Sequence, residues 1–362
     1  MAKLIIGIDF SKEKMNFCCM DAQDMSVLME GEVENSRQGC GEMTGRLRSL
    51  RNGLRSCDLL FCGENTGIYS IEVAECLTAR KYFVWLENPL QLKLSSGIRR
   101  SKTDTLDARM IAEYAYRHQD KAERFSASSE GLKKLRELHL TRRKLKDCEI
   151  ALKNFSGSLS KDSLPAVKAL RKVMESIKEA IRTLEKKIRE QLMHEPEFME
   201  NASLALTVPG ISWVTASAII LDTRNFTRFS TARQYANHTG CVPHEHDSGT
   251  SVHRKPRVSK ASNRYVNSLL TQGANSLITH NPQTREYAQK KRKEGKPHGF
   301  IVNNIRNKII HRLFAVIRNR KAFDWAYVNE YQTQQPCGKT KLRVVINVLK
   351  SVKSAGAAFL ME

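Results

Sequence analysis

The chain has 362 residues, and its 60 lysines and arginines against 38 aspartates and glutamates leave a formal net charge of +22. Its nine cysteines are scattered, with neither a CxxC pair nor zinc-ligand spacing, which indicates reduced thiols in a cytoplasmic protein. The N-terminal apolar stretch is too short for a signal peptide, and no apolar run is long enough to span a membrane. The length predicts two or three domains, and the charge favours binding to the phosphates of nucleic acid.

Residues 1–125 alternate between strand and helix patterns. Three apolar runs separated by polar turns predict an antiparallel meander: "LIIGIDFS", "MNFCCMDA" and "SVLMEGEVEN". Helices are expected from Gly41 to Leu50 and from about Ile71 to Arg80. The single strands "DLLFCGE" and "YFVWLENP" follow these two helices, and another helix is expected from "KTDTLDAR" onward. This order predicts an α/β domain with a mixed sheet.

Residues 126–196 have the pattern of two long amphipathic helices, "GLKKLRELHLTRRKLKDCEIAL" and "AVKALRKVMESIKEAIRTLEKKIREQL". Apolar residues in the second recur at alternating spacings of three and four, as in a coiled coil: Leu170, Val173, Ile177, Ile181, Leu184, Ile188 and Leu192. An antiparallel helical hairpin is therefore expected. Packing against a globular domain and an exposed dimerisation arm both remain open.

Residues 197–362 read as a mainly helical domain. "LALTVPGISWVTASAIIL" predicts two apolar helices joined by a Pro-Gly turn, and "HEHDSGTSVHRKPRVSKASNR" predicts a polar loop. A densely basic region follows, and its helix "FIVNNIRNKIIHRLFAVIRNR" has an apolar stripe with arginines opposite. The tail after Gln332 is basic and weakly patterned, with room for one further helix.

Four acidic residues are candidates for chemistry. Asp9 ends the first strand, Glu64 follows a later one, and Asp104 and Asp107 share one face of a helix. Four converging carboxylates repel unless a divalent cation neutralises them, and Mg²⁺ or Mn²⁺ prefers such oxygen ligands. Paired ions can hold both sides of a phosphoryl displacement, so the set predicts metal-dependent chemistry on a phosphodiester. Three basic residues precede the aspartate pair: Arg99, Arg100 and Lys102.

A structural interpretation of the same acids stays open. Ser101 or Thr103 would cap the helix, and Asp104 and Asp107 would then stabilise its first turn by about 0.3–1 kcal/mol each. Asp9 alone would equally suit a turn at the end of a strand. Because one helix start can serve both purposes, the two interpretations are compatible.

Asp9 in "IGIDFSKEK", Glu64 in "ENTGIYS" and the segment "KTDTLDAR" resemble the Asp-Glu-Asp-Asp tetrad of the DEDD transposases of the insertion-sequence-110 family. Those enzymes are bridge-RNA-guided recombinases, with Piv-type DNA invertases as relatives. "VPGISWVTASAII", "FSTARQYANHTGCVP" and "SGTSVHRKPRVSKASNRYV" resemble the family's later blocks in order. The resemblance implies a ribonuclease-H-like (RuvC-like) α/β domain at 1–125, a coiled-coil hairpin at 126–196 and a mainly α transposase domain at 197–362.

In this family the nucleophile is a serine in the "SG" loop, which is Ser248 here. The resemblance implies that its hydroxyl attacks a DNA phosphate and forms a phosphoserine link, while the tetrad binds Mg²⁺ or Mn²⁺. Basic residues of this region are expected to contact nucleic acid: Arg254, Lys255, Arg257, Lys260, Arg264, Lys291, Arg292, Arg306 and Arg312.

The resemblance also implies partners. These are donor and target DNA, together with a structured guide (bridge) RNA from the element itself, which chooses both by base pairing. Strand exchange needs at least two active sites, so an oligomer is expected, and the resemblance implies a homodimer that assembles into a tetramer on DNA. No membrane partner is expected, and the location implied is the cytoplasm of a bacterium or archaeon, at the nucleoid.

Two weaker motifs and three other functions stay open. "VPGIS" resembles a phosphate-binding helix-hairpin-helix, but Ser212 stands where the family has a second glycine, so a plain helical turn is as compatible. His244 and His246 suit either a metal or a solvated loop. The other functions are a Holliday-junction-type endonuclease that uses water, a sugar or acetate kinase of the same superfold, and a non-catalytic nucleic-acid-binding protein. The kinase would need a second glycine-rich phosphate loop, which is not apparent.

Overall fold

The computed structural model describes residues 2–95, 103–159, 164–248, 252–258 and 262–324. The chain divides into two compact units, Met1–Lys134 and Leu135–Glu362. The dividing point falls inside a helix, so the predicted domain boundaries at 125/126 and 196/197 stay predictions. Among the helices of the described residues, none combines the length and low polarity that a bilayer crossing requires.

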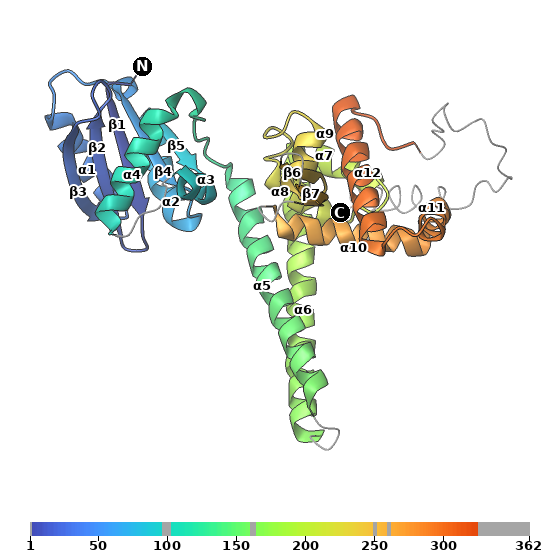
Figure 1. Ribbon diagram of the computed structural model, residues 1–362. Helices are drawn as coiled ribbons and strands as arrows, with labels where there is room; N and C mark the ends of the chain where they lie inside the picture. The colour runs from blue at the N-terminus through green and yellow to red at the C-terminus, as the bar shows by residue number, and fades with distance from the viewer. Residues whose placement is uncertain (1, 96–102, 160–163, 249–251, 259–261, 325–362) are drawn as a thin grey trace. The chain divides into compact units, whose positions relative to one another are not determined.

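The first unit contains a five-stranded sheet in the order β3-β2-β1-β4-β5 (Figure 1). β1 pairs antiparallel with β2 and β2 with β3, whereas β1, β4 and β5 run parallel. The strands are β1 (Leu4–Phe10), β2 (Lys14–Asp21), β3 (Val27–Glu34), β4 (Leu59–Glu64) and β5 (Phe83–Glu87). The predicted meander and mixed sheet are confirmed, and this strand order is that of the ribonuclease-H-like fold.

Helices cover both faces of this sheet. They are α1 (Arg37–Ser49), α2 (Ile68–Ala79), α3 (Pro89–Ser95) and α4 (Asp104–Arg117), with 3-10 turns at Ser56–Asp58 and Gln119–Lys121. Alternate β1 residues point to opposite faces: Ile6 lies in a buried cluster with residues of α1 and α2. Ile5 lies in another cluster with residues of α3 and α4. The near-continuous apolar pattern of β1 follows from burial on both faces.

Two helix predictions needed correction. α1 begins four residues earlier than predicted, because Ser36 caps it and its first turn has no apolar residue before Cys40 to mark the pattern. α3 was missed, since seven residues are too few to reveal a helical period.

The second unit begins within a helical hairpin of two long helices, α5 (Glu130–Ser158) and α6 (Leu164–His194) (Figure 1), and an ion pair between Arg142 and Glu185 at 2.7 Å joins them. Ile188 and Leu192 of α6 are fully buried, and α6 packs against α7 and α8 of the same unit. Farther along the hairpin, Ile150, Phe155 and Val173 are 56, 55 and 49% exposed. One end therefore packs on a globular core, and the other presents apolar side chains to solvent.

The remaining helices surround one buried apolar cluster. They are α7 (Pro196–Thr207), α8 (Trp213–Asp222), α9 (Ala232–His238), α10 (Arg264–His280), α11 (Pro282–Lys293) and α12 (His298–Asn319). The Pro-Gly turn between α7 and α8 lies against α10, where a Cβ at Gly273 would come closer than 3.0 Å to the Gly210 carbonyl oxygen. The Ile211 amide bonds to Val208, and Ser212 caps α8. These contacts define a tight turn between two helices, and both the plain turn and the phosphate-binding hairpin stay predictions.

The polar loop predicted for 244–264 was wrong in part, because the structure has a two-stranded antiparallel hairpin there. Its strands are β6 (Pro243–Ser248) and β7 (Val252–Val258). The register places Lys255 and Pro256 opposite the single residue Glu245, a bulge that accommodates a proline without an N–H. Backbone hydrogen bonds hold such a hairpin, and its polar sequence has no apolar alternation that would have revealed it.

A buried polar network joins α5, α8 and α10. His139 is 3% exposed; its Nδ1 lies 2.9 Å from the Tyr265 hydroxyl and its Nε2 lies 2.8 Å from Ser217 Oγ. Ser217 donates its hydroxyl proton to the Val214 carbonyl, so it accepts from His139 Nε2–H, and Nδ1 accepts from Tyr265. Burial, with a smaller contribution from nearby Arg142, lowers the pKa of His139 to about 4, so the ring is neutral at pH 7.

Acidification is expected to destabilise the protein through His139. Its folded-state pKa lies below its ordinary value of 6.5, so stability is unaffected above pH 6.5 and is lost as pH falls towards 4. Between pH 7.5 and 4.5 this loss amounts to about 2 to 3 kcal/mol. Urea unfolding at both pH values measures it, and His139→Gln should lose less stability over the same interval by that amount. Equal losses in the two proteins would contradict the assignment.

Candidate active site

Asp9 and Glu64 lie at the ends of neighbouring parallel strands. The β1–β4 register pairs Ile8 with Gly63, so the next residues, Asp9 and Glu64, lie side by side at the same sheet edge. Both are partly exposed. In β4, Cys62 belongs to the buried cluster on the α4 side, and side chains alternate along a strand, so Glu64 belongs to that face as well.

α4 lies directly on β1 because residue 7 is a glycine. A Cβ at Gly7 would come closer than 3.0 Å to the backbone of Ala108 and Ala112, so the helix approaches the strand without a side chain between them. Ile111 and the residues after it pack near Ile5, towards the start of β1. The helix therefore runs antiparallel to β1, and its first turn overlies the edge where Asp9 lies.

The start of α4 combines both predicted roles. Thr103 is the N-cap, and its hydroxyl accepts a hydrogen bond from the Leu106 amide at 3.3 Å, which confirms the capping interpretation. Asp104 is exposed and Asp107 is partly exposed, both in the first turn. Ser101, a predicted alternative cap, lies outside the described residues. So do three predicted phosphate contacts, Arg99, Arg100 and Lys102.

Charged neighbours hold this end of the helix in place. Arg109 Nε donates to Glu30 Oε1 of β3 at 2.9 Å. At the start of β2, a hydrogen bond to Glu32 raises the pKa of Lys14, and the negative charge of Asp104 raises it further. Asp104 therefore lies within electrostatic reach of the strand that follows Asp9.

The four carboxylates share one region without forming a closed metal site. In the residues that the structure describes, no three His, Cys, Asp or Glu side chains come close enough together to hold a metal ion. The donor set nevertheless fits Mg²⁺ or Mn²⁺ chemically, because all its ligands are carboxylate oxygens. The tetrad as a metal site stays a prediction.

Another carboxylate at this edge was missed by the sequence analysis. The β4–β5 register places Glu87 directly beside Glu64. The Tyr114 hydroxyl of α4 donates to Glu87 Oε2 at 2.9 Å, and the Asn88 amide donates to Oε1 at 2.6 Å. Burial and this carboxylate raise the pKa of Tyr114 to about 12. The signal was in the sequence, since "WLEN" repeats the strand-end acid of "FCGEN".

Ser248 is the last residue of β6, and its backbone pairs with Val252, the first residue of β7. Of the predicted basic contacts, Arg254 and Arg257 lie on β7 with backbones opposite His246 and His244. Lys255 is also on β7, at the bulge, and Lys260 lies outside the described residues. The hairpin thus carries the predicted nucleophile and a basic strand together.

The remaining basic candidates fall into two groups. Arg264 and Arg292 are exposed, at the start of α10 and near the end of α11, and Lys291 pairs with Glu294 at 2.6 Å. Arg306 and Arg312 are half-buried instead. The Arg312 guanidinium lies over the Phe323 ring, 5.1 Å from its centroid, and burial lowers the pKa of Arg312.

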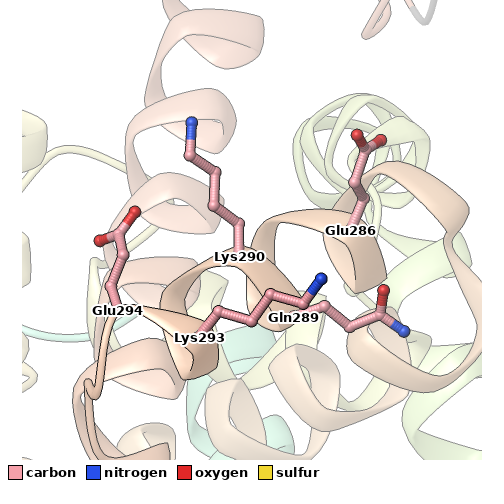
Figure 2. A pocket seen from close by; sticks show the side chains of 5 residues that line it. All are labelled: Glu286, Gln289, Lys290, Lys293 and Glu294. Atoms are coloured by element: carbon pink, nitrogen blue, oxygen red, sulfur yellow. The ribbon is translucent and has the colours of Figure 1, made fainter.

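The end of α11 carries a surface hollow of about 430 Å³ (Figure 2). Its lining combines acids, lysines and one glutamine: Glu286, Gln289, Lys290, Lys293 and Glu294. A ligand site is usually concave, mostly apolar and formed from several elements. All the side chains that line this hollow come from one end of α11, and most are charged. The sheet edge therefore remains the candidate active site.

Comparisons with known proteins find transposase relatives for both compact units. A family model of transposases of the DEDD type of IS110 matches residues 6–159, and a model described as Transposase IS116/IS110/IS902 family matches residues 202–289. A pilin gene-inverting protein of Moraxella bovis is 25% identical over 334 residues, covering 90% of this chain and 98% of that protein. The insertion element IS110 43.6 kDa protein of Streptomyces coelicolor is 26% identical over 42% of this chain and 36% of its own length.

Among solved structures, Thermus thermophilus RuvC in complex with a Holliday junction substrate is 14% identical, with a TM-score of 0.25. The match covers 34% of this chain and 99% of the RuvC chain. The two family models match in order, one beginning in each compact unit. Over residues 6–159 and 202–289, this chain is therefore similar to transposases of the IS110 group.

Proposed function

We propose that this protein is an RNA-guided DNA recombinase that cuts and rejoins strands to move a genetic element. The similarity to transposases supports the reaction class. The observation that carries the proposal is the sheet edge where Asp9 and Glu64 lie beneath the first turn of α4, which bears Asp104 and Asp107. The relative that inverts a pilin gene covers almost the same length, which supports recombination as the outcome.

In this proposal the four carboxylates hold Mg²⁺ or Mn²⁺ against the scissile phosphate. The metal supplies charge for the phosphate oxygens as the phosphorus is attacked. Asp9 and Glu64 provide ligands from the sheet, and Asp104 and Asp107 provide them from the helix. Thr103 caps the turn that carries both aspartates and has no part in holding the metal.

Ser248 is the proposed nucleophile. Its hydroxyl oxygen bonds to the phosphorus, a bond from phosphorus to a deoxyribose oxygen breaks, and that oxygen takes up a proton as a free hydroxyl. The product is a phosphoserine ester, from which a hydroxyl of another strand can later displace the serine. The similarity to transposases supports this role, because the matched C-terminal segment includes Ser248.

The proposed partners are donor DNA, target DNA and a guide RNA from the element. The net charge of +22 suits a protein that binds phosphate backbones and leaves sequence recognition to base pairing. Strand exchange requires two active sites, so a homodimer that assembles into a tetramer performs it. The exposed apolar residues Ile150, Phe155 and Val173 support a contact between subunits at the helical hairpin.

Paired substitutions at the start of α4 separate its capping role from its metal role. Thr103→Ala is expected to lower the free energy of unfolding by about 1 kcal/mol and to leave Mg²⁺-dependent cleavage in place. Asp104→Asn is expected to slow cleavage by roughly 10³-fold, since metal charge stabilisation is worth several kcal/mol, and to change stability by less than about 1 kcal/mol. Cleavage of the element's flanking DNA and urea unfolding measure the two effects.

The opposite pattern would contradict the metal role. If Asp104→Asn lost stability but cleaved DNA like the unmodified protein, the aspartates would only stabilise the helix. The second candidate function, a junction endonuclease with water as nucleophile, uses the same sheet edge. It therefore predicts the same results for Thr103→Ala and Asp104→Asn. Only Ser248 separates it from the recombinase.

A further inference from the structure

Side-chain hydrogen bonds hold the backbone carbonyls just before β6, the strand that ends at Ser248. Asn267 of α10 donates through Nδ2 to the Thr239 carbonyl at 2.7 Å and to the Gly240 carbonyl at 3.5 Å. Asn303 of α12 donates through Nδ2 to the Cys241 carbonyl at 2.9 Å. Three consecutive carbonyls just before β6 therefore accept hydrogen bonds from two asparagine amides.

A single guanidinium orients both amides. Arg306 donates through Nη2 to Asn303 Oδ1 at 2.7 Å, and through Nη1 to Asn267 Oδ1 and to Thr271 Oγ1. An asparagine amide has one acceptor end and one donor end, so binding Oδ1 to an arginine turns Nδ2 the other way. The rigid fork of Arg306 thus directs two Nδ2 groups at the carbonyls where the hairpin begins.

The segments that lead from α9 into the hairpin and from the hairpin into α10 also contact each other. The Asn263 amide donates to the His238 carbonyl at 3.0 Å. Gly240 has a φ of +70°, and a Cβ there would lie 2.7 Å from the Ser262 side chain and 3.1 Å from Val258. Only glycine fits this backbone conformation and this space. The direction in which the hairpin leaves the unit is therefore set by close contacts at its base.

We propose that Arg306 is a positioning residue for the nucleophile, because it orients Asn267 and Asn303 and thereby fixes the base of the β6–β7 hairpin. This inference rests on the proposed role of Ser248, which lies seven residues beyond Cys241 on the same strand segment. The basic character of α12 had predicted that Arg306 contacts nucleic acid. Its guanidinium instead acts within the protein.

The two roles of Arg306 predict opposite results. Loss of a phosphate contact would weaken DNA binding and reduce the slope of log affinity against log salt by about 1. Arg306→Lys keeps the positive charge but loses the fork that reaches two asparagines. A phosphate contact would largely survive that change, whereas the positioning contact would not.

The test compares Arg306→Lys with Arg318→Lys, a matched control at an exposed position of the same helix. For Arg306→Lys we expect hydrogen exchange of backbone amides between residues 239 and 258 to accelerate by about 10-fold or more. The rate of Ser248–DNA adduct formation at saturating DNA should fall by about 10²-fold, as displacement of a reacting group by 1 Å does. DNA affinity and its salt slope should stay within about 2-fold of the unmodified protein, and Arg318→Lys should change none of the rates.

Asn303→Ala provides a second variant: it removes the bond to the Cys241 carbonyl and the bond that Asn303 accepts from Arg306, and it should accelerate exchange near Cys241. Unchanged exchange in both variants, or weaker DNA binding with a normal adduct rate, would overturn the positioning role. If the unmodified protein forms no adduct at Ser248, the proposed function fails. The exchange measurement still decides whether Arg306 holds the hairpin.

Discussion

Ser248→Ala is expected to abolish the covalent protein–DNA adduct and to lower recombination by on the order of 10⁴-fold or more. The substitution removes the hydroxyl that is proposed to form the phosphoserine ester, so strand transfer would lose its covalent route. DNA binding should persist, because the proposed phosphate contacts lie on other residues. The measurement is mass spectrometry of the denatured, nuclease-digested protein from cells that carry the element's flanking DNA.

Ser251→Ala is the matched control, because it removes a hydroxyl from the same short segment without touching the proposed nucleophile. It should retain the adduct. An adduct that depends on both Ser248 and Asp104 would support serine-mediated recombination. Mg²⁺-dependent nicking that survives Ser248→Ala would instead support the junction endonuclease with water as nucleophile.

Gly7→Ala is expected to lower the free energy of unfolding of the first unit by about 3 kcal/mol and to slow DNA cleavage by about 10²-fold. The added methyl group would overlap the backbone of Ala108 and Ala112, which cannot move aside as a flexible side chain would. α4 must therefore shift away from β1, and Asp104 and Asp107 shift with it. A displacement of about 1 Å is enough for that loss of rate.

Gly45→Ala serves as the control within the same unit. Gly45 lies in α1, and a methyl group added there would have nothing within 4 Å, so alanine should leave cleavage unchanged. It should raise the free energy of unfolding by about 0.5–1 kcal/mol, because alanine favours a helix. Chemical denaturation and a cleavage time course measure both variants. Normal cleavage by a destabilised Gly7→Ala protein would show that the placement of α4 does not control the chemistry.

Local patterns were enough to predict the strands of the first unit, the long helices of the second and the acids at strand ends. Apolar residues recur every two positions in a half-buried strand and every three to four positions in a helix. Each segment therefore shows its own type of structure without its neighbours. The order of "GIDFS", "GENTG" and "KTDTLDAR" was likewise visible without coordinates. The hairpin at Pro243–Ser248 and Val252–Val258 was not, because its polar residues carry no burial pattern.

The sequence by itself determined the fold class, the family resemblance and the candidate acids with Ser248, because each depends on residue types in a short stretch. Only the tertiary structure decided that Glu87 lies beside Glu64, that α4 rests on Gly7, and that Arg306 points at two asparagines. These facts depend on strand register, on how closely a helix approaches a strand, and on which way a long side chain turns. Residues far apart in the chain set all three. The positive charge of Arg306 is the same whether its side chain faces phosphate or protein, so the sequence did not reveal its contacts.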